Sequence, residues 1–127
     1  MKTINRLLIN ICSANLAASK NFYIKLFDFT VDYDSDWFVH LISKGKGLEL
    51  GIIDRTHALV PTAYQNAPNG CYITFVVDNA DILFETAKTE SFEIIEKPTD
   101  TFYGQRRLLI KDPDGTLVDI SSPTPNS

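Results

Sequence analysis

The chain has 127 residues, of which 44% are hydrophobic and 22% charged, a balance typical of one soluble globular domain rather than a disordered or fibrous chain. The net charge is -4 and the basic residues are scattered apart from the pair Arg106 and Arg107, so nucleic acid is not an expected partner. No apolar run reaches the roughly 20 residues that span a bilayer and no secretory cleavage site is recognisable, which predicts a cytoplasmic protein without a membrane partner. Cys12 and Cys71 are too few for a disulfide framework and are expected to be reduced thiols.

The first half of the sequence predicts a strand, a helix and three more strands. The first strand lies in "RLLINICS", and Asn15 is expected to cap the helix that follows it. The apolar side of this helix is formed by Leu16, Phe22, Tyr23, Leu26 and Phe27. Three strand-like segments come next, at residues 30–33, 37–43 and 48–53.

The second half repeats this order from Tyr72. A strand in "YITFVV" leads to Asp78 or Asn79 as the cap of a second helix. Three strand-like segments follow again, at residues 93–97, 106–111 and 117–121. The last two are joined by "DPDG", in which proline and glycine favour a tight hairpin turn.

The sequence therefore predicts one α+β domain over residues 1–127, built from two βαβββ modules at about 4–54 and 71–122. A linker at 55–70 joins the modules. It contains two prolines and no sustained periodicity, and a connection of this length is unusual inside a compact domain.

Three stretches, taken in this order, make a family resemblance specific. They are "NLAASKNFYIKLFDF" after the first strand, "FVVDNADILFETAK" in the second half, and the late "GQRRLLIKDPDGTLVDI". Together with the paired βαβββ modules, they resemble the vicinal oxygen chelate superfamily, which includes glyoxalases, bleomycin resistance proteins and extradiol dioxygenases. The resemblance covers about residues 4–122 and implies a curled mixed sheet around a cavity, the glyoxalase/bleomycin resistance/dihydroxybiphenyl dioxygenase fold.

The resemblance also implies positions for a metal site. Metal-binding members of the family take four ligands from the first, fourth, fifth and eighth strands, and these positions fall on Leu8, Glu49, Tyr72 and Asp119. Leucine does not bind metal and tyrosine replaces the family's histidine. The two acidic residues, Glu49 and Asp119, are left as the candidate catalytic residues, both expected to point into the cavity.

Two carboxylates without imidazole partners make a poor transition-metal site, so we expect no cofactor. His40 would share a face with Glu49 if the turn at "GKG" has two or four residues, and would lie on the opposite face if it has three. In the first case the alternative is a divalent metal (Zn, Ni, Co, Mn or Fe) held by Glu49, Asp119 and His40.

Without a metal, Glu49 and Asp119 are expected to pair with donors such as Asn10, Thr74 or an arginine. Arg107 or its neighbour would project beside Asp119 if the last two strands pair through the "DPDG" turn. The arginine then either neutralises Asp119 in a salt bridge or holds an anionic ligand.

A cavity without a metal suits a small organic ligand, and aromatic side chains around it would supply the contacts. The residues expected to bind this ligand are Trp37, Phe38, His40, Tyr72, Tyr103 and Arg107. Alternation along 37–43 places Trp37 and Phe38 on opposite faces, so only one set can line a cavity, and the sequence leaves that choice open. Core packing is an equally ordinary role for several of these aromatic residues.

One motif-like string is not expected to bind metal. Asp32, Asp34 and Asp36 have the spacing of the first ligands of a calcium loop, but Trp37 stands where glycine must turn and Ser43 where a bidentate glutamate belongs. We therefore interpret this stretch as a polar strand end or turn.

The function that the sequence favours is binding of a small organic molecule, of the bleomycin-resistance or glyoxalase-like type and without the family's metal site. The alternative is a metal-dependent lyase or related enzyme that uses Glu49, Asp119 and His40, and a third class is a scaffold with a vestigial cavity. Because resembling proteins close their cavity by pairing two modules, within one chain or across two, the long linker also favours a homodimer.

Overall fold

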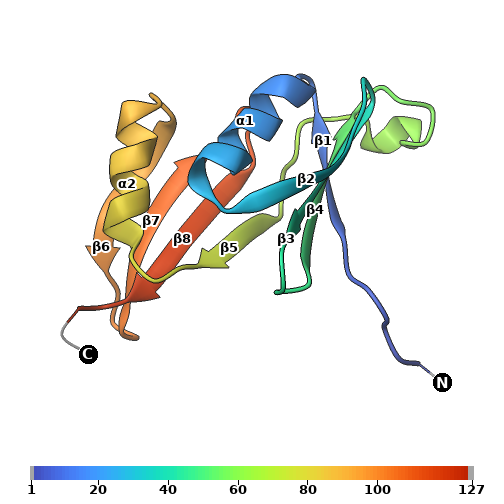
Figure 1. The fold of residues 1–127 in the computed structure, drawn as a ribbon. Coiled ribbons are helices and arrows are strands. Elements are labelled where there is room, and N and C mark those ends of the chain that lie inside the picture. The colour runs from blue at the N-terminus through green and yellow to red at the C-terminus, as the bar shows by residue number, and fades with distance from the viewer. Residues whose placement is uncertain (1, 126–127) are drawn as a thin grey trace. The chain divides into compact units, whose positions relative to one another are not determined.

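The computed structural model describes residues 2–125, and these form two compact units whose boundary lies between Ala67 and Pro68 (Figure 1). Both units have the same order of elements, one strand, one helix and three strands. The prediction of two βαβββ modules is therefore confirmed. Within the described residues, no helix is long and apolar enough to cross a membrane.

The first unit contains a four-stranded mixed sheet and one long helix. Its elements are β1 (Ile9–Ser13), α1 (Leu16–Leu26), β2 (Phe29–Asp34), β3 (Phe38–Ser43) and β4 (Leu48–Asp54). The strand order is β1-β4-β3-β2, with β1 parallel to β4 and the other pairs antiparallel.

Helix α1 is stabilised by an N-cap at its start and by the packing of its apolar side. The side chain of Asn15 accepts a hydrogen bond from the backbone N–H of Ala18 at 3.0 Å, as expected for an N-cap. Phe22 and Tyr23 are completely buried, and their rings meet edge to face with centroids 4.9 Å apart. These side chains form the core of the first unit together with residues from β3 and β4, namely Val39, Leu41, Leu50 and Ile52.

The second unit repeats this arrangement. Its elements are β5 (Tyr72–Val76), α2 (Ala80–Thr89), β6 (Glu93–Asp100), β7 (Gln105–Lys111) and β8 (Leu117–Pro123). The strand order is β5-β8-β7-β6, with β5 parallel to β8. Its fully buried side chains include Leu108, Ile110, Val118 and Ile120 from β7 and β8.

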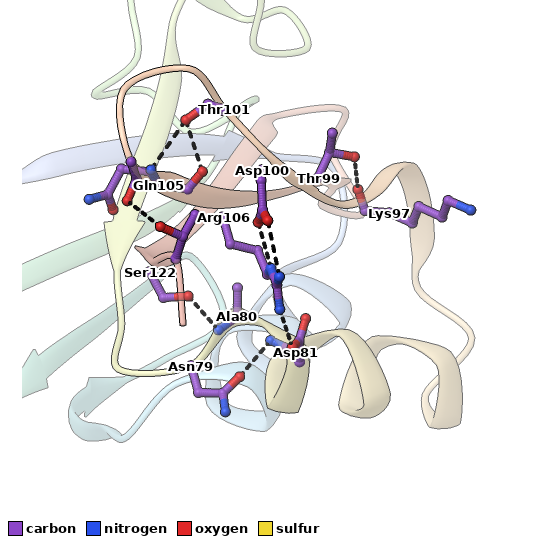
Figure 2. Close-up of polar contacts among 12 residues, drawn as sticks. Asn79, Ala80, Asp81, Lys97, Thr99, Asp100, Thr101, Gln105, Arg106 and Ser122 are labelled. Atoms are coloured by element: carbon purple, nitrogen blue, oxygen red, sulfur yellow. Dashed lines mark hydrogen bonds and ion pairs between the residues drawn. The ribbon is translucent and has the colours of Figure 1, made fainter. Parts of the chain in front are cut away.

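Polar contacts fix the start of α2 against its sheet (Figure 2). Asn79 is the N-cap, and its side chain accepts from the backbone N–H of Asp81 at 2.9 Å. The backbone N–H of Ala80 donates to Ser122 Oγ on β8 at 2.9 Å. Arg106 on β7 donates to Asp81 at 2.9 Å and to Asp100 on β6 at 2.7 Å, so its guanidinium ties the helix to two strands.

The "DPDG" turn closes the β7–β8 hairpin as the sequence predicts. The side chain of Asp112 is buried and accepts from the backbone N–H groups of Asp114 and Thr116 at 2.9 and 2.8 Å. Gly115 has a φ of 94°, in the left-handed region that favours glycine. Strand β8 is thereby set in register against β7, with Leu109 opposite Asp119.

The segment expected to be a structureless linker is partly ordered. Asp54 accepts hydrogen bonds from the backbone and side chain of Thr56, and the short 3-10 helix η1 (Thr62–Tyr64) follows. Val60 is buried, and its carbonyl accepts from the side chain of Gln65 at 2.9 Å. Residues 55–67 therefore belong to the first unit rather than to a free connection.

Candidate functional site

The register of β3 decides which of its side chains are available for binding. Val39 and Leu41 are 1% and 0% exposed and pack into the core beside α1. The side chains of opposite parity lie on the other face of the sheet, which we call the open face of unit 1. The residues on this face include Asn10, Cys12, Phe38, His40, Ile42, Glu49, Gly51 and Ile53.

His40 and Glu49 share this face because the β3–β4 connection has four residues, 44–47, between the paired Ser43 and Leu48. Alternation about Glu49 predicts that Leu48 lies in the core beside Leu50, but Leu48 is 59% exposed, so that prediction is wrong. Leu48 is the first residue of β4, at the end of the strand.

Four charged or titratable side chains form a row across the open face, which we call the polar row: Arg6, Glu49, His40 and Asp32. The Arg6 guanidinium donates to the Glu49 carboxylate, with Nε at 2.8 and 2.7 Å from the two oxygens and Nη2 at 2.5 Å from Oε1. His40 Nε2 lies 2.7 Å from Glu49 Oε1, and His40 Nδ1 lies 2.9 Å from Asp32 Oδ2.

The inner members of the polar row are shielded and the outer members are not. The side chains of Glu49 and His40 are 14% and 12% exposed, whereas those of Arg6 and Asp32 are 59% and 52% exposed. Hydrogen bonding from the Arg6 guanidinium lowers the pKa of Glu49 to about 2, with a smaller contribution from His40. The same contact raises the pKa of Arg6, so the pair remains ionised near neutral pH.

A β-bulge in β2 places Asp32 in this row. Val31 pairs with Leu41 and Tyr33 pairs with His40, so the register shifts between Val31 and Tyr33. Asp32 is the extra residue, and both Asp32 and Tyr33 reach the open face instead of alternating across the sheet. Asp32 was part of the sequence pattern that resembles a calcium loop, and in the structure it contacts the His40 ring.

Phe38 is the centre of an aromatic group next to the polar row. Its ring centroid lies 6.4 Å from those of Tyr33 and His40 and 5.4 Å from that of Trp37. Trp37 precedes β3 and stacks on His57 at 4.3 Å, so its ring is already covered on one side. Phe38 and His40 rather than Trp37 are the strand residues that lie on the open face.

Gly51 makes room for this group. It pairs with Asn10 on β1 and with His40 on β3, on the open face. A Cβ at this position would lie 2.1 Å from Asn10 Oδ1 and 3.0 Å from the Phe38 ring. The glycine is therefore required for the present positions of both side chains.

The second unit has a corresponding open face, formed by Tyr72, Thr74, Arg107, Leu109, Leu117, Asp119 and Ser121. Asp119 is 6% exposed, and its carboxylate accepts from Ser121 Oγ at 2.7 Å and from Thr74 Oγ1 at 3.0 Å. Thr74 was one of the donors expected for this residue, and its hydroxyl together with that of Ser121 satisfies both carboxylate oxygens.

Arg107 lies on the same face, opposite Ser121, but forms no salt bridge with Asp119 among the residues that the structure describes. Its neighbour Arg106 points instead to α2 (Figure 2). The Nε atom of Arg107 is buried without a hydrogen-bond partner. Of the two roles considered for this arginine, neutralising Asp119 is therefore not observed.

The remaining predicted ligand contacts are exposed. Tyr72 on the edge strand β5 is 55% exposed, and Tyr103 lies in the β6–β7 turn with its ring edge to face with Phe102. Both side chains are accessible, and neither fills the core of the second unit.

The residues present do not fit the family's metal site. His40 contacts Glu49 and Asp32 through opposite ring nitrogens, so the three side chains form a line and do not surround one point. Within residues 2–125, no group of three or more His, Cys, Asp or Glu side chains is arranged to hold a metal ion. Glu49 is already bound to a guanidinium, and both carboxylate oxygens of Asp119 already accept hydrogen bonds from hydroxyl groups.

Arg6 and Gly51 are site residues that the sequence did not reveal. Arg6 lies in a segment without helix or strand, and no local pattern relates it to Glu49, 43 positions later. The one available signal was the run "GLELG", in which a glycine two residues after the glutamate occupies the same face of a strand.

A separate hollow of about 440 Å³ lies elsewhere in the first unit. It is lined by the first turn of α1, the β2–β3 connection and Asp54, and none of the predicted site residues lines it. Three of its charged groups are engaged, since Lys20 pairs with Asp34 and Asp54 accepts from Thr56, and the fourth, Asp36, is exposed.

Comparison with known proteins agrees with this architecture. The family model of the Glyoxalase/Bleomycin resistance protein/Dioxygenase superfamily matches residues 3–120. This chain therefore belongs to that superfamily. No curated protein matches the sequence.

Solved structures of similar fold share little sequence with this chain. A glyoxalase/bleomycin resistance protein/dioxygenase family enzyme from Burkholderia phytofirmans PsJN is 22% identical, with a TM-score of 0.77, over 91% of this chain and 96% of its own. TnmS3, an antibiotic binding protein from Streptomyces sp. CB03234, is 18% identical, with a TM-score of 0.74, over 98% and 99%. A glyoxalase-related enzyme from Fulvimarina pelagi is 16% identical, with a TM-score of 0.73, over 96% and 88%.

Proposed function

We propose that this chain binds a small organic molecule on the open face of unit 1 and does so without a metal ion. The observation that carries the proposal is the engagement of Glu49, the one first-unit acid at a family ligand position, by Arg6 and His40. A carboxylate that is held by a guanidinium is not available to a divalent ion. The same residues make a polar wall that a ligand can contact.

The surroundings of the polar row suit an organic ligand. Phe38 supplies an aromatic surface beside Glu49 and His40, and Tyr33, which is 48% exposed, extends it. A ligand with an aromatic portion gains stacking energy there while its polar groups meet the row. TnmS3, which has a similar fold, is an antibiotic binding protein, and this kind of function needs affinity and shape rather than a catalytic group.

We also propose that the protein acts as a homodimer. β1 and β5 are edge strands of their sheets in the described part of the chain, and Tyr72 and Val76 on β5 are 55% and 75% exposed. Exposed apolar residues on an edge strand are a common site of association.

A thermal-shift screen tests the binding proposal. The protein is melted with a panel of aromatic and heterocyclic compounds, and in parallel with nickel, zinc, cobalt and manganese salts. Binding to the folded state raises the melting temperature, so we expect organic compounds and not metals to raise it. A rise with a metal that disappears in Glu49→Gln would overturn the proposal in favour of the metal-dependent lyase.

A further inference from the structure

We propose that Arg6 is an internal occupant of a site for an organic cation, and that a ligand bearing a guanidinium or amidinium group takes its place against Glu49. This inference rests on the proposed function and names the ligand class for the same face of unit 1.

Arg6 contacts Glu49 through a forked pair of N–H donors, Nε and Nη2. The carboxylate of Glu49 receives three N–H contacts from Arg6, at 2.8, 2.7 and 2.5 Å, in the forked arrangement that planar guanidinium and amidinium groups share. An ammonium group is a point charge and cannot reproduce two parallel donors. The site as built therefore favours a flat, forked cation.

Arg6 is held less firmly than the carboxylate that it contacts. Residues 2–7 are all exposed and lie outside any helix or strand, and the Arg6 side chain itself is 59% exposed. The site it occupies is far more shielded, since Glu49 and His40 are 14% and 12% exposed. The acceptor is thus fixed by two strands, whereas the donor can leave without unfolding either of them.

The polar row without Arg6 has an excess of negative charge. Without Arg6, the polar row consists of Glu49 and Asp32 on either side of one imidazole, His40. Two carboxylates outweigh a single histidine even when its ring is protonated, so the row without Arg6 requires a cation from elsewhere. Lys2 is the other basic residue of the segment, and no ion pair joins it to the row among the described contacts.

Aromatic side chains beside Glu49 offer a contact surface for the uncharged part of the ligand. Phe38 lies beside His40 with nearly parallel rings, 21° apart, and Tyr33 flanks it on the bulged strand. A cation joined directly to an aromatic ring can meet Glu49 and this aromatic surface at once. Arylguanidines and arylamidines are the simplest molecules with both features.

Calorimetric titration with phenylguanidinium tests the inference, with phenylurea as its neutral and nearly isosteric control. Arg6 competes intramolecularly in the wild type, so Arg6→Ala is expected to bind phenylguanidinium about tenfold more tightly. Lys2→Ala, which removes a charge from the same segment, is the matched control and is expected to behave as wild type. Adding Glu49→Gln to Arg6→Ala is expected to abolish the gain.

A second measurement reports on the Arg6 side chain directly. In the wild type, the NMR signal of the Arg6 Nε–H group is expected to move toward that of a free arginine as phenylguanidinium is added, and to stay in place with phenylurea. The inference is overturned if Arg6→Ala and wild type bind phenylguanidinium equally, or if phenylurea gains as much from the substitution. If neutral or anionic compounds of the thermal-shift panel bind while phenylguanidinium does not, this inference fails and the proposed function stands. If no compound of any class binds, both fail.

Discussion

At the scale of single residues, the contact between Arg6 and Glu49 determines the chemistry of the open face. In the family position where a metal ligand is expected, Glu49 is ionised, shielded and already satisfied by a guanidinium. Tyr72, at another ligand position, is an exposed phenol on an edge strand. Glu49 and Asp119 were predictable from the sequence because strand alternation and a family motif both mark them. Arg6 was not, because its partner is 43 residues away and no periodicity connects the two.

Acid titration should reveal the Arg6–Glu49 pair. The folded-state pKa of Glu49 is about 2, below its ordinary value of 4.5, so its contribution to the free energy of unfolding is complete above about pH 4.5 and is lost as the pH falls toward 2. Urea unfolding of wild type and Glu49→Gln at a series of pH values measures this. The stability difference between them should be constant from pH 7 to 5 and shrink at lower pH. A difference that does not depend on pH would contradict the assigned contact.

Substitution of Tyr72 tests whether the ligand contacts the second unit. The Tyr72 side chain is 55% exposed and lies on β5, so Tyr72→Ala is expected to lower the free energy of unfolding by less than about 1 kcal/mol and to leave ligand affinity on the open face of unit 1 unchanged. Chemical denaturation and calorimetry on the same preparation compare the two effects. Weaker ligand binding at unchanged stability would contradict a site formed by unit 1 alone.

At the scale of elements, local signals in the sequence predict most of what forms. The caps at Asn15 and Asn79 and the "DPDG" hairpin depend on neighbouring residues, and all three are present. The features that build the site depend on longer-range geometry. The four-residue β3–β4 turn places His40 beside Glu49, and the bulge at Asp32 brings a second acid to His40. Turn length and bulges change the face of a side chain without changing strand propensity, so alternation alone could not predict them.

The cap of α1 offers a test of this local account. Asn15→Ala removes the hydrogen bond to the backbone of Ala18 and should lower the free energy of unfolding by about 1 kcal/mol. The same substitution at the exposed Asn21 inside the helix should raise it by about 0.5 kcal/mol, because alanine is the better helix former. Urea denaturation measures both, and a similar effect at the two positions would argue against the cap.

At the scale of the whole molecule, the same βαβββ plan carries two different open faces. The first has the Arg6, Glu49, His40 and Asp32 row, whereas in the second Asp119 is satisfied by two hydroxyl groups. The repeat was predictable because each half has its own cap, helix and strand pattern. Thr74 and an arginine were among the donors expected for the acids, and Thr74 does donate to Asp119. Which arginine holds Glu49 was not predictable, because Arg6 lies outside the helices and strands.

Sedimentation velocity at micromolar concentration tests the proposed homodimer. We expect a dimer, and we expect Val76→Lys on the exposed edge of β5 to shift it toward monomer through like-charge repulsion. Lys111→Glu on β7 alters the charge of an exposed residue away from that edge, and is expected to leave the dimer intact. A monomeric wild-type chain that binds ligand with full affinity would rule out a role for dimerisation.

Binding of an organic molecule without a metal is tested by calorimetric titration of one compound from the thermal-shift panel under two conditions. One titration is made after exhaustive treatment with a chelator, and the other after addition of nickel or zinc in excess of the protein. Because Glu49 is held by Arg6 and His40, we predict the same affinity in both conditions. Loss of binding after chelation, with recovery when the metal is restored, would show that the ligand binds through a metal ion.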